Sequence, residues 1–230
     1  MTDLVLSLFP GIGLMDMAFE QVGFCVVRGP DLLWGGDVRE FHPPQGRFDG
    51  VIGGPPCQMF STASRLRPGI VRENLIPEFE RCVGEAGPAW FLMENVRGAP
   101  IPAVDGYQVH SILLNNRWLG EEQNRVRRFS FGTRDGRKLV IPADALVLLE
   151  NSRYEYCVTA HDHTGGNWEG SARGKGRSVR EMIHLQGLPD DWDIPPFTRR
   201  ALGIAVGNGV PLPMGLAVAR AVAMAIGGNR

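Results

Sequence analysis

The amino-acid sequence predicts an open α/β fold, in which strands alternate with helices and ligands bind at the carboxyl ends of the strands. Three short apolar runs rich in branched and aromatic residues, near residues 4–9, 48–52 and 89–93, are typical of buried strands. Each run is followed directly by glycines, prolines or acidic residues. Because strand ends meet at one edge of such a sheet, we expect these turn residues to share a crevice.

Length and composition narrow the class of protein. With 230 residues and 43% hydrophobic content, the chain can form one large domain, or one domain with a small appendage. We expect a cytoplasmic protein, because no apolar run is long enough to span a bilayer and no basic region precedes the first apolar residues. A net charge of -1 argues against indiscriminate polyanion binding but permits a local basic face.

The cysteines predict neither disulfides nor a metal site. No short paired spacing connects the four of them, which are Cys25, Cys57, Cys82 and Cys157. Cys157 with His161 and His163 supplies too few ligands for a tetrahedral site, so we expect no metal.

The first unit is a strand, a glycine turn and a helix. The strand runs from Leu4 to Phe9, and apolar residues then recur at helical spacing over 14–22. Gly11 and Gly13 in the turn allow the backbone to approach a ligand closely, although an ordinary tight turn has the same composition.

Two acidic residues follow the second strand, Phe24 to Val27. Asp31 stands where a carboxylate can take both hydroxyls of a ribose, or where it can serve as a turn residue beside Pro30. Asp37 comes only six residues later, which leaves no room for a full helix between them. It is either a second ligand contact or another turn residue.

The third strand ends in the sequence GGPPCQMFS, from Gly53 to Ser61. Two prolines before Cys57 fix the backbone and remove donors, so the thiol stands on a stiff turn, as a nucleophile would be presented. A buried cysteine that only fills space is the alternative. The following residues, 59–74, contain Arg65, Arg67 and Arg72, which suit either a phosphate-contacting loop over the crevice or a solvated surface loop.

A second reactive group follows the helix 75–85 and the strand 89–93. Glu94 comes directly after apolar residues, so partial desolvation is expected to raise its pKa and to let it share a proton near neutrality. The alternative is a helix-capping or salt-bridged glutamate. Residues 104–114 have the spacing of another amphipathic helix.

Alternation before the strand at Phe129 and Phe131 places Gln123, Arg125 and Arg127 on one face. Such guanidinium groups stabilise an anionic oxygen or a phosphate, or form a basic sheet edge that discourages aggregation.

The regular pattern stops over residues 132–176, and the glycine and basic content of residues 164–177 predicts a flexible, exposed segment there. Order resumes with a capping box, formed by Ser178 and Glu181, for a helix that Gly187 and Pro189 end. A last helix is expected over 210–226.

Together these motifs resemble the DNA (cytosine-5)-methyltransferase family, in the family's order and over residues 4–226. The motifs are FPGIG at Phe9, GDV at Gly36, GGPPCQMFS at Gly53, ENV at Glu94, QNRVRR at Gln123, REMIHLQGLPDDW at Arg180 and GNGVP at Gly207. The resemblance implies the class I S-adenosylmethionine-dependent methyltransferase fold, which is Rossmann-like with a mostly parallel sheet. It also implies a catalytic domain over 1–131 and 177–230, with a reduced target-recognition segment over 132–176.

The same resemblance implies methyl transfer from S-adenosylmethionine to C5 of a cytosine that is flipped out of duplex DNA, through a covalent adduct with C6. The implied catalytic residues are Cys57, Glu94, Arg125 and Arg127. The implied cofactor-binding residues are Phe9, Gly11, Gly13, Asp31, Leu32, Asp37, Val38, Pro56, Leu75 and Asn208. The implied substrate or DNA contacts are Gln58, Ser61, Arg65, Arg67, Asn95, Gln123, Trp168, Arg173 and Lys175.

Several positions depart from the family pattern. Ser7 stands where the family usually has an aspartate, Leu14 replaces a common glycine, and the 31–37 segment is short. The recognition segment is also short, which predicts a short or relaxed target of about two to four base pairs. We expect the protein to act as a monomer and to have no membrane partner. Methylation of a free cytosine nucleotide or RNA, or a catalytically silent DNA-binding homologue, are the alternatives.

Overall fold

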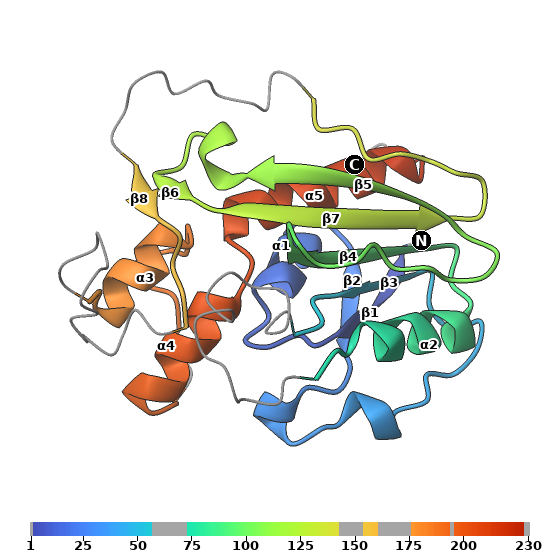
Figure 1. Ribbon diagram of the computed structural model, residues 1–230, viewed down its shortest axis with the longest axis horizontal. Helices are drawn as coiled ribbons and strands as arrows, with labels where there is room; N and C mark the ends of the chain where they lie inside the picture. Colours follow the sequence, from blue (N-terminus) through green and yellow to red (C-terminus); the bar gives the residue numbers. More distant parts are fainter. Residues whose placement is uncertain (1, 57–72, 143–153, 161–175, 194–195, 228–230) are drawn as a thin grey trace.

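The computed structural model describes residues 2–56, 73–142, 154–160, 176–193 and 196–227. Its centre is a six-stranded sheet in the order β2-β1-β3-β4-β7-β5 (Figure 1). The strands are β1 (Leu4–Leu8), β2 (Cys25–Arg28), β3 (Gly50–Gly53), β4 (Trp90–Val96), β5 (Gln108–Asn115) and β7 (Val126–Thr133). The first four in spatial order are parallel, and β7 is antiparallel to both of its neighbours. The mostly parallel class I sheet is therefore confirmed.

Helices cover both faces of the sheet because its strands alternate two sets of apolar side chains. Val5 and Ile52 belong to a core with α1 (Leu14–Val22) and α5 (Leu212–Ala225), whereas their neighbours Leu6 and Val51 belong to a core with α2 (Ile76–Ala86). The last helix packs beside the unit that carries the first motif, since α1 and α5 lie in contact.

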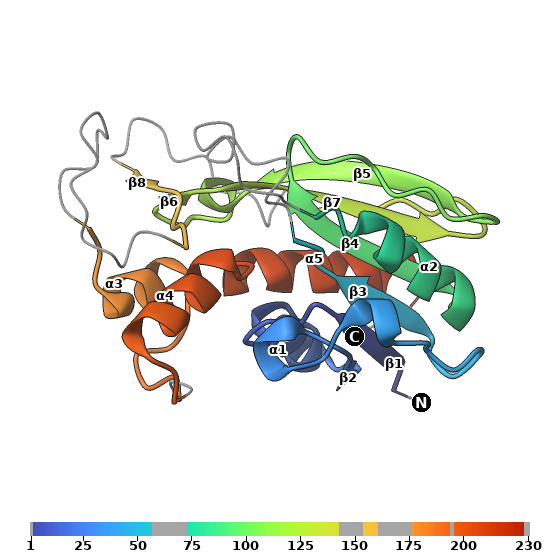
Figure 2. The same ribbon diagram turned by 60° about the horizontal axis from the view of Figure 1, so that its bottom comes forward.

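A smaller unit lies at one end of the main sheet (Figure 2). It contains a two-stranded sheet of β6 (Gln123–Asn124) and β8 (Glu155–Tyr156), with α3 (Val179–Leu185) and α4 (Arg199–Asn208). Its own apolar cluster joins α3 and α4 to the start of α1. The capping box of α3 forms as expected, while α4 was not predicted.

The helix predicted over 104–114 is wrong, because residues 108–115 form β5. Gly106 has a φ of 79° and Tyr107 N donates to Val104 O, so the chain turns and then runs straight. From Gln108 to Asn115 the strand pairs with β7 along its whole length. The Asp105-Gly106 pair is a turn signal that the helical spacing concealed.

Residues Arg199–Ala225 are long and apolar enough in composition to cross a membrane. The structure divides this stretch into α4 and α5 at residues 209–211. Both helices bury apolar side chains such as Val206 and Val218 in the core clusters. They have the form of core helices.

Candidate functional site

The candidate site lies where β4 extends beyond its parallel neighbour. β3 ends at Gly53, which pairs with Met93, but β4 continues beside antiparallel β7 until Val96 pairs with Arg127. Glu94 therefore stands inside a strand and not just after it, as the sequence suggested. Because β3 has already ended, the Glu94 side chain can face Gly54, where an added Cβ would lie 3.2 Å from Oε2.

Glu94 forms a buried ion pair with Arg127. The Nε of Arg127 lies 3.0 Å from Oε1 of Glu94, and the two side chains are only 15% and 11% exposed. Burial raises the pKa of the Glu94 carboxyl, while the charges of Arg127 and Arg125 oppose this shift. The predicted desolvation and the salt-bridged alternative are thus both present, and they act on the pKa of Glu94 in opposite directions.

Asn95 links Glu94 to the proline turn. Its Nδ2 donates to Pro55 O at 3.2 Å, and its Oδ1 accepts from Val96 N at 2.8 Å. Because Pro55 and Pro56 precede Cys57 in the chain, this bond fixes the start of the predicted nucleophile's turn against β4. Seven of the predicted residues lie outside the described residues together with Cys57: Gln58, Ser61, Arg65, Arg67, Trp168, Arg173 and Lys175.

The glycine turn after β1 is built on left-handed backbone. Phe9, Gly11 and Gly13 have φ values of 56°, 56° and 80°. The Asp31 carboxylate holds this turn, since Oδ2 accepts from Gly11 N and Oδ1 accepts from Leu33 N, both at 2.8 Å. A side chain at position 11 or 13 would be strained at these angles, as the side chain of Phe9 already is.

Trp34 lies beside the glycine turn, although the sequence did not single it out. It ends a short 3₁₀ helix, η1 (Leu32–Trp34), which replaces the helix that the 31–37 segment cannot hold. Its Nε1 donates to Gly11 O at 2.6 Å, and its ring packs at 5.2 Å from the ring of Phe197. Trp34 and Leu32 remain 54% and 67% exposed, so they are available to a ligand at the glycine turn.

Asp37 begins a second 3₁₀ helix, η2 (Val38–Glu40), and Arg39 pairs with it. Hydrogen bonds from Arg39 lower the pKa of Asp37 to about 2. Arg39 also lies 3.0 Å from Glu73. Val38 and Leu75, which were predicted to bind the cofactor, are buried in the apolar cluster that contains α2. Phe9 of the glycine turn packs against this cluster.

The C-terminal motif meets the glycine turn from the other side. Asn208 is the exposed last residue of α4. The next residue, Gly209, packs so closely on α1 that an added Cβ would lie 2.5 Å from the Leu14 side chain. The leucine that replaces the family's glycine thus contacts the Asn208 segment.

Arg125 takes a different position from the one expected at the substrate. It is 1% exposed, and its guanidinium donates to Val158 O at 2.7 Å, Gly209 O at 2.8 Å and Gly207 O at 3.2 Å. Burial lowers the pKa of this guanidinium. Arg125 therefore connects the chain between β6 and β7 to the Asn208 segment. Arg127 is the arginine that pairs with Glu94.

Gln123 is likewise internal rather than at a DNA-facing surface. It is fully buried, donates to Leu185 O at 2.6 Å and to Gln186 Oε1 at 3.1 Å, and accepts from Val158 N. Gln186 in turn donates to Val206 O and Gly209 O. We call Gln123, Arg125 and Gln186 the polar hub, because they join β6, α3 and the end of α4.

Ser7 stands where the family usually has an aspartate, and it is hydrogen-bonded to a carboxylate on α1. Its Oγ donates to Asp16 Oδ1 at 2.5 Å, and Asp16 Oδ2 lies 3.0 Å from Arg28 Nε. Burial raises the pKa of Asp16, and Ser7 and Arg28 oppose the shift. The side chain of Arg28 lies over Gly13, where an added Cβ would approach Nη2 to 2.4 Å. A charged pair therefore supports the glycine turn despite the departure at position 7.

Cys157 stands beside the buried arginines. Its Sγ accepts from Arg125 Nη1 at 3.3 Å. Burial alone would raise the pKa of this thiol, but Arg125 and Arg127 together hold the pKa below its usual value.

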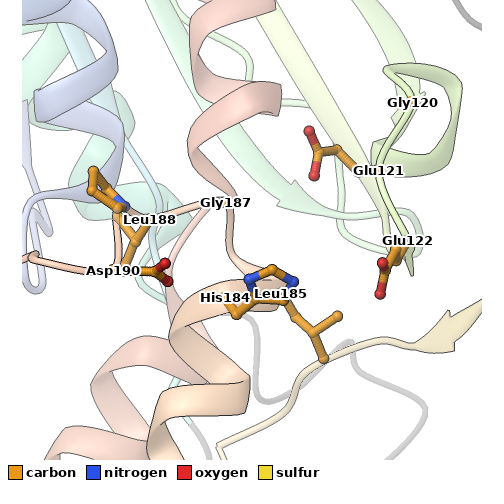
Figure 3. A pocket seen from close by; sticks show the side chains of 9 residues that line it. Gly120, Glu121, Glu122, His184, Leu185, Gly187, Leu188 and Asp190 are labelled. Carbon is orange, nitrogen blue, oxygen red and sulfur yellow. The ribbon is translucent and has the colours of Figure 1, made fainter.

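A cavity of about 440 Å³ lies apart from the Glu94–Arg127 pair and the glycine turn, between the chain entering β6 and the end of α3 (Figure 3). Glu121 and Glu122 face His184 and Asp190 across it. Burial and Glu122 raise the pKa of Glu121. Across the described part of the chain, these and other acidic, histidine and cysteine side chains form no group of three suited to a metal.

Comparison with known proteins assigns the family. The family described as C-5 cytosine-specific DNA methylase matches residues 35–100. The Type II methyltransferase M.HgiGI of Herpetosiphon aurantiacus is 32% identical over 120 residues, which cover 94% of that relative and 43% of this chain. The chain belongs to the C-5 cytosine-specific DNA methylase family.

Other family members are longer than this chain. M.HgiDI of Herpetosiphon aurantiacus is 29% identical over 191 residues, and M.FnuDI of Fusobacterium nucleatum is 35% identical over 161 residues. These matches cover 70% and 56% of this chain but 60% and 46% of the relatives, so the chain spans about half of their length.

Solved structures share the methylase fold. A mutant of DNMT2 from Spodoptera frugiperda superimposes with a TM-score of 0.68 at 13% identity, covering 96% of this chain and 99% of that one. The Entamoeba histolytica methyltransferase EhMeth gives a TM-score of 0.66 at 12% identity, covering 98% and 99%.

Proposed function

We propose that this methylase transfers a methyl group from S-adenosylmethionine to C5 of a cytosine in DNA, with Cys57 as the nucleophile. The observation that carries the proposal is the buried Glu94–Arg127 pair at the end of β4, tied through Asn95 to the turn that precedes Cys57. A carboxyl with a raised pKa and a guanidinium match the N3 and O2 edge of cytosine. The family description, C-5 cytosine-specific DNA methylase, supports DNA as the substrate.

The residues of the glycine turn fit S-adenosylmethionine. A Cβ built on Gly11 would meet no atom within 4 Å, so the backbone is open to a ligand there. The Asp31 oxygens each accept one backbone bond and keep a lone pair for ribose hydroxyls. Exposed Leu32 and Trp34 offer apolar surface to an adenine. When bound, the cofactor supplies an electrophilic methyl on a sulfonium centre.

The chemistry requires the nucleophile and the base-binding pair to act together. The Cys57 thiolate would add to C6 of cytosine, and the π electron pair of the C5–C6 double bond would move to C5. C5 would take the methyl group, and the electron pair of the broken S–CH3 bond would stay on sulfur, which leaves as a neutral thioether. Protonated Glu94 donates to N3 and Arg127 holds O2, so both stabilise the adduct. Loss of the C5 proton to water returns the electron pair and expels the thiolate. Flipping the cytosine out of the duplex is what brings it to these groups.

A trapping experiment tests the nucleophile. DNA containing 5-fluorocytosine should give a covalent adduct that persists on a denaturing gel, because fluorine cannot leave C5 as a cation. Cys57→Ser should abolish the adduct and methyl transfer while S-adenosylmethionine binding stays near normal. Cys25→Ser is the matched control, since Cys25 is exposed on β2.

The same assay separates the substrate classes. Wild-type protein is incubated with labelled S-adenosylmethionine and duplex DNA, single-stranded DNA, tRNA or dCMP. Transfer to dCMP or tRNA alone would refute DNA as the substrate, and retained turnover in Cys57→Ser would refute the nucleophile.

A further inference from the structure

Exposed aromatic side chains gather where the short helix η4 (Asn116–Trp118) meets β8. The rings of Tyr154 and Tyr156 meet edge to face, with centroids 5.9 Å apart and planes at 75°. The guanidinium carbon of Arg117 lies 4.8 Å from the centroid of the Tyr154 ring, and Trp118 is the next residue of η4. The three aromatic side chains are 42–45% exposed. We call Arg117, Trp118, Tyr154 and Tyr156 the aromatic face.

This combination differs from scattered surface side chains. A single exposed apolar residue needs no explanation, because much of any protein surface is apolar. Two tyrosines in contact, with an arginine stacked on one of them, form a built surface that offers ring faces and positive charge together. Nucleic-acid strands are bound by such surfaces, where bases stack on aromatic rings and cations contact phosphates.

The position of the aromatic face relates it to the proposed base site. Tyr156 directly precedes Cys157, whose thiol is hydrogen-bonded to Arg125. The charge of Arg127 also lowers the pKa of this thiol. Arg127 is the partner of Glu94. An extended chain rises by at most about 3.6 Å per residue, so the Cα atoms of both tyrosines lie within about 11 Å of the Cys157 Cα.

The surrounding charges favour one direction for a polyanion. Glu155, between the two tyrosines, is paired with Arg177 at 2.8 Å, so its charge is compensated. The cavity lined by Glu121, Glu122 and Asp190 is acidic and repels phosphates. A DNA strand that leaves the base site is therefore directed over Arg117 and the tyrosines.

We propose that the aromatic face holds the DNA strand beside the flipped cytosine, with Tyr154 and Tyr156 stacking on exposed bases and Arg117 contacting a phosphate. The inference rests on the proposed function and deepens it, because it names residues that contact the DNA beyond the flipped base. Tyr154 and Tyr156 lie within the 132–176 segment that the sequence implied for target recognition, whereas Arg117 lies outside it.

Direct binding tests the inference independently of methyl transfer. Anisotropy of a fluorescein-labelled DNA duplex is measured at several KCl concentrations. Tyr154→Ala combined with Tyr156→Ala should weaken binding about tenfold, whereas the double phenylalanine variant, which keeps both rings, should stay close to wild type. Arg117→Gln should lower the slope of log K against log[salt] by about 1.

Controls separate a lost contact from a lost fold. Met224→Ala changes an equally exposed side chain at the far end of α5 and should bind duplex like wild type. S-adenosylmethionine affinity should be unchanged in every variant. Duplex binding by the double alanine variant at wild-type strength, or wild-type protein that binds no duplex, would overturn the inference. Wild-type binding to duplex without any methyl transfer would instead refute the proposed function.

Discussion

Replacing Arg125 or Arg127 distinguishes an internal tie from a substrate contact. The two arginines are two residues apart and near the same carboxylate, yet the structure gives them different partners. Arg125→Met removes the guanidinium donors from Val158 O and Gly207 O, whereas Gly209 O keeps a donor from Gln186 and Val158 O keeps only the weak thiol donor of Cys157. Each buried carbonyl that loses its strong donor costs about 1–3 kcal/mol, which gives about 2–6 kcal/mol for two.

Methionine also removes a buried positive charge, and this gain offsets part of the cost. We therefore expect Arg125→Met to lose about 2–4 kcal/mol of unfolding free energy, a large part of the 5–15 kcal/mol of a typical domain. Arg127→Met should lose less stability, because the Glu94 carboxyl can take up a proton when its partner is absent. Its methyl transfer should nevertheless fall strongly.

Urea unfolding at constant slope measures the stability difference, and labelled methyl transfer measures activity. Arg128→Met is the control, because in the described structure Arg128 donates to a single carbonyl, Ala99 O. The control should change the unfolding free energy by about 1 kcal/mol. An Arg125→Met protein that unfolds like wild type but is inactive would refute the internal role and would return Arg125 to the substrate.

Three further predictions concern single side chains. Glu94→Gln should lower methyl transfer by about 10²–10⁴-fold. Because the folded-state pKa of Glu94 is raised, its contribution to the unfolding free energy is fully present below about pH 4.5 and is lost as pH rises through the folded-state pKa. Thermal unfolding of the glutamine variant should therefore depend less on pH. Asp16→Ala should destabilise the fold by about 1–3 kcal/mol in urea, because Ser7 loses its buried partner. Trp34→Ala should weaken S-adenosylmethionine binding about tenfold by calorimetry, and an unchanged dissociation constant would exclude Trp34 from the pocket.

The sequence by itself determined the parallel strands of the central sheet and the order of the site motifs. Strand β1 is a short apolar run followed by the turn at Pro10 and Gly11, and β3 ends at Gly53. The capping box at Ser178 and Glu181 defines the start of α3. These features are local, because backbone preferences and side-chain periodicity act over a few residues. The same information placed Glu94 at the sheet edge and predicted its desolvation.

Only the tertiary structure decided β5 and the roles of the two arginines. Residues 108–115 carry apolar side chains that suit a helix face, and pairing with β7 makes them a strand. Arg125 and Arg127 look equivalent in the sequence, but the carbonyls that bind Arg125 lie 33, 82 and 84 residues away. Contacts at such separation depend on how α4 and α5 dock beside the sheet, and no local pattern encodes that arrangement.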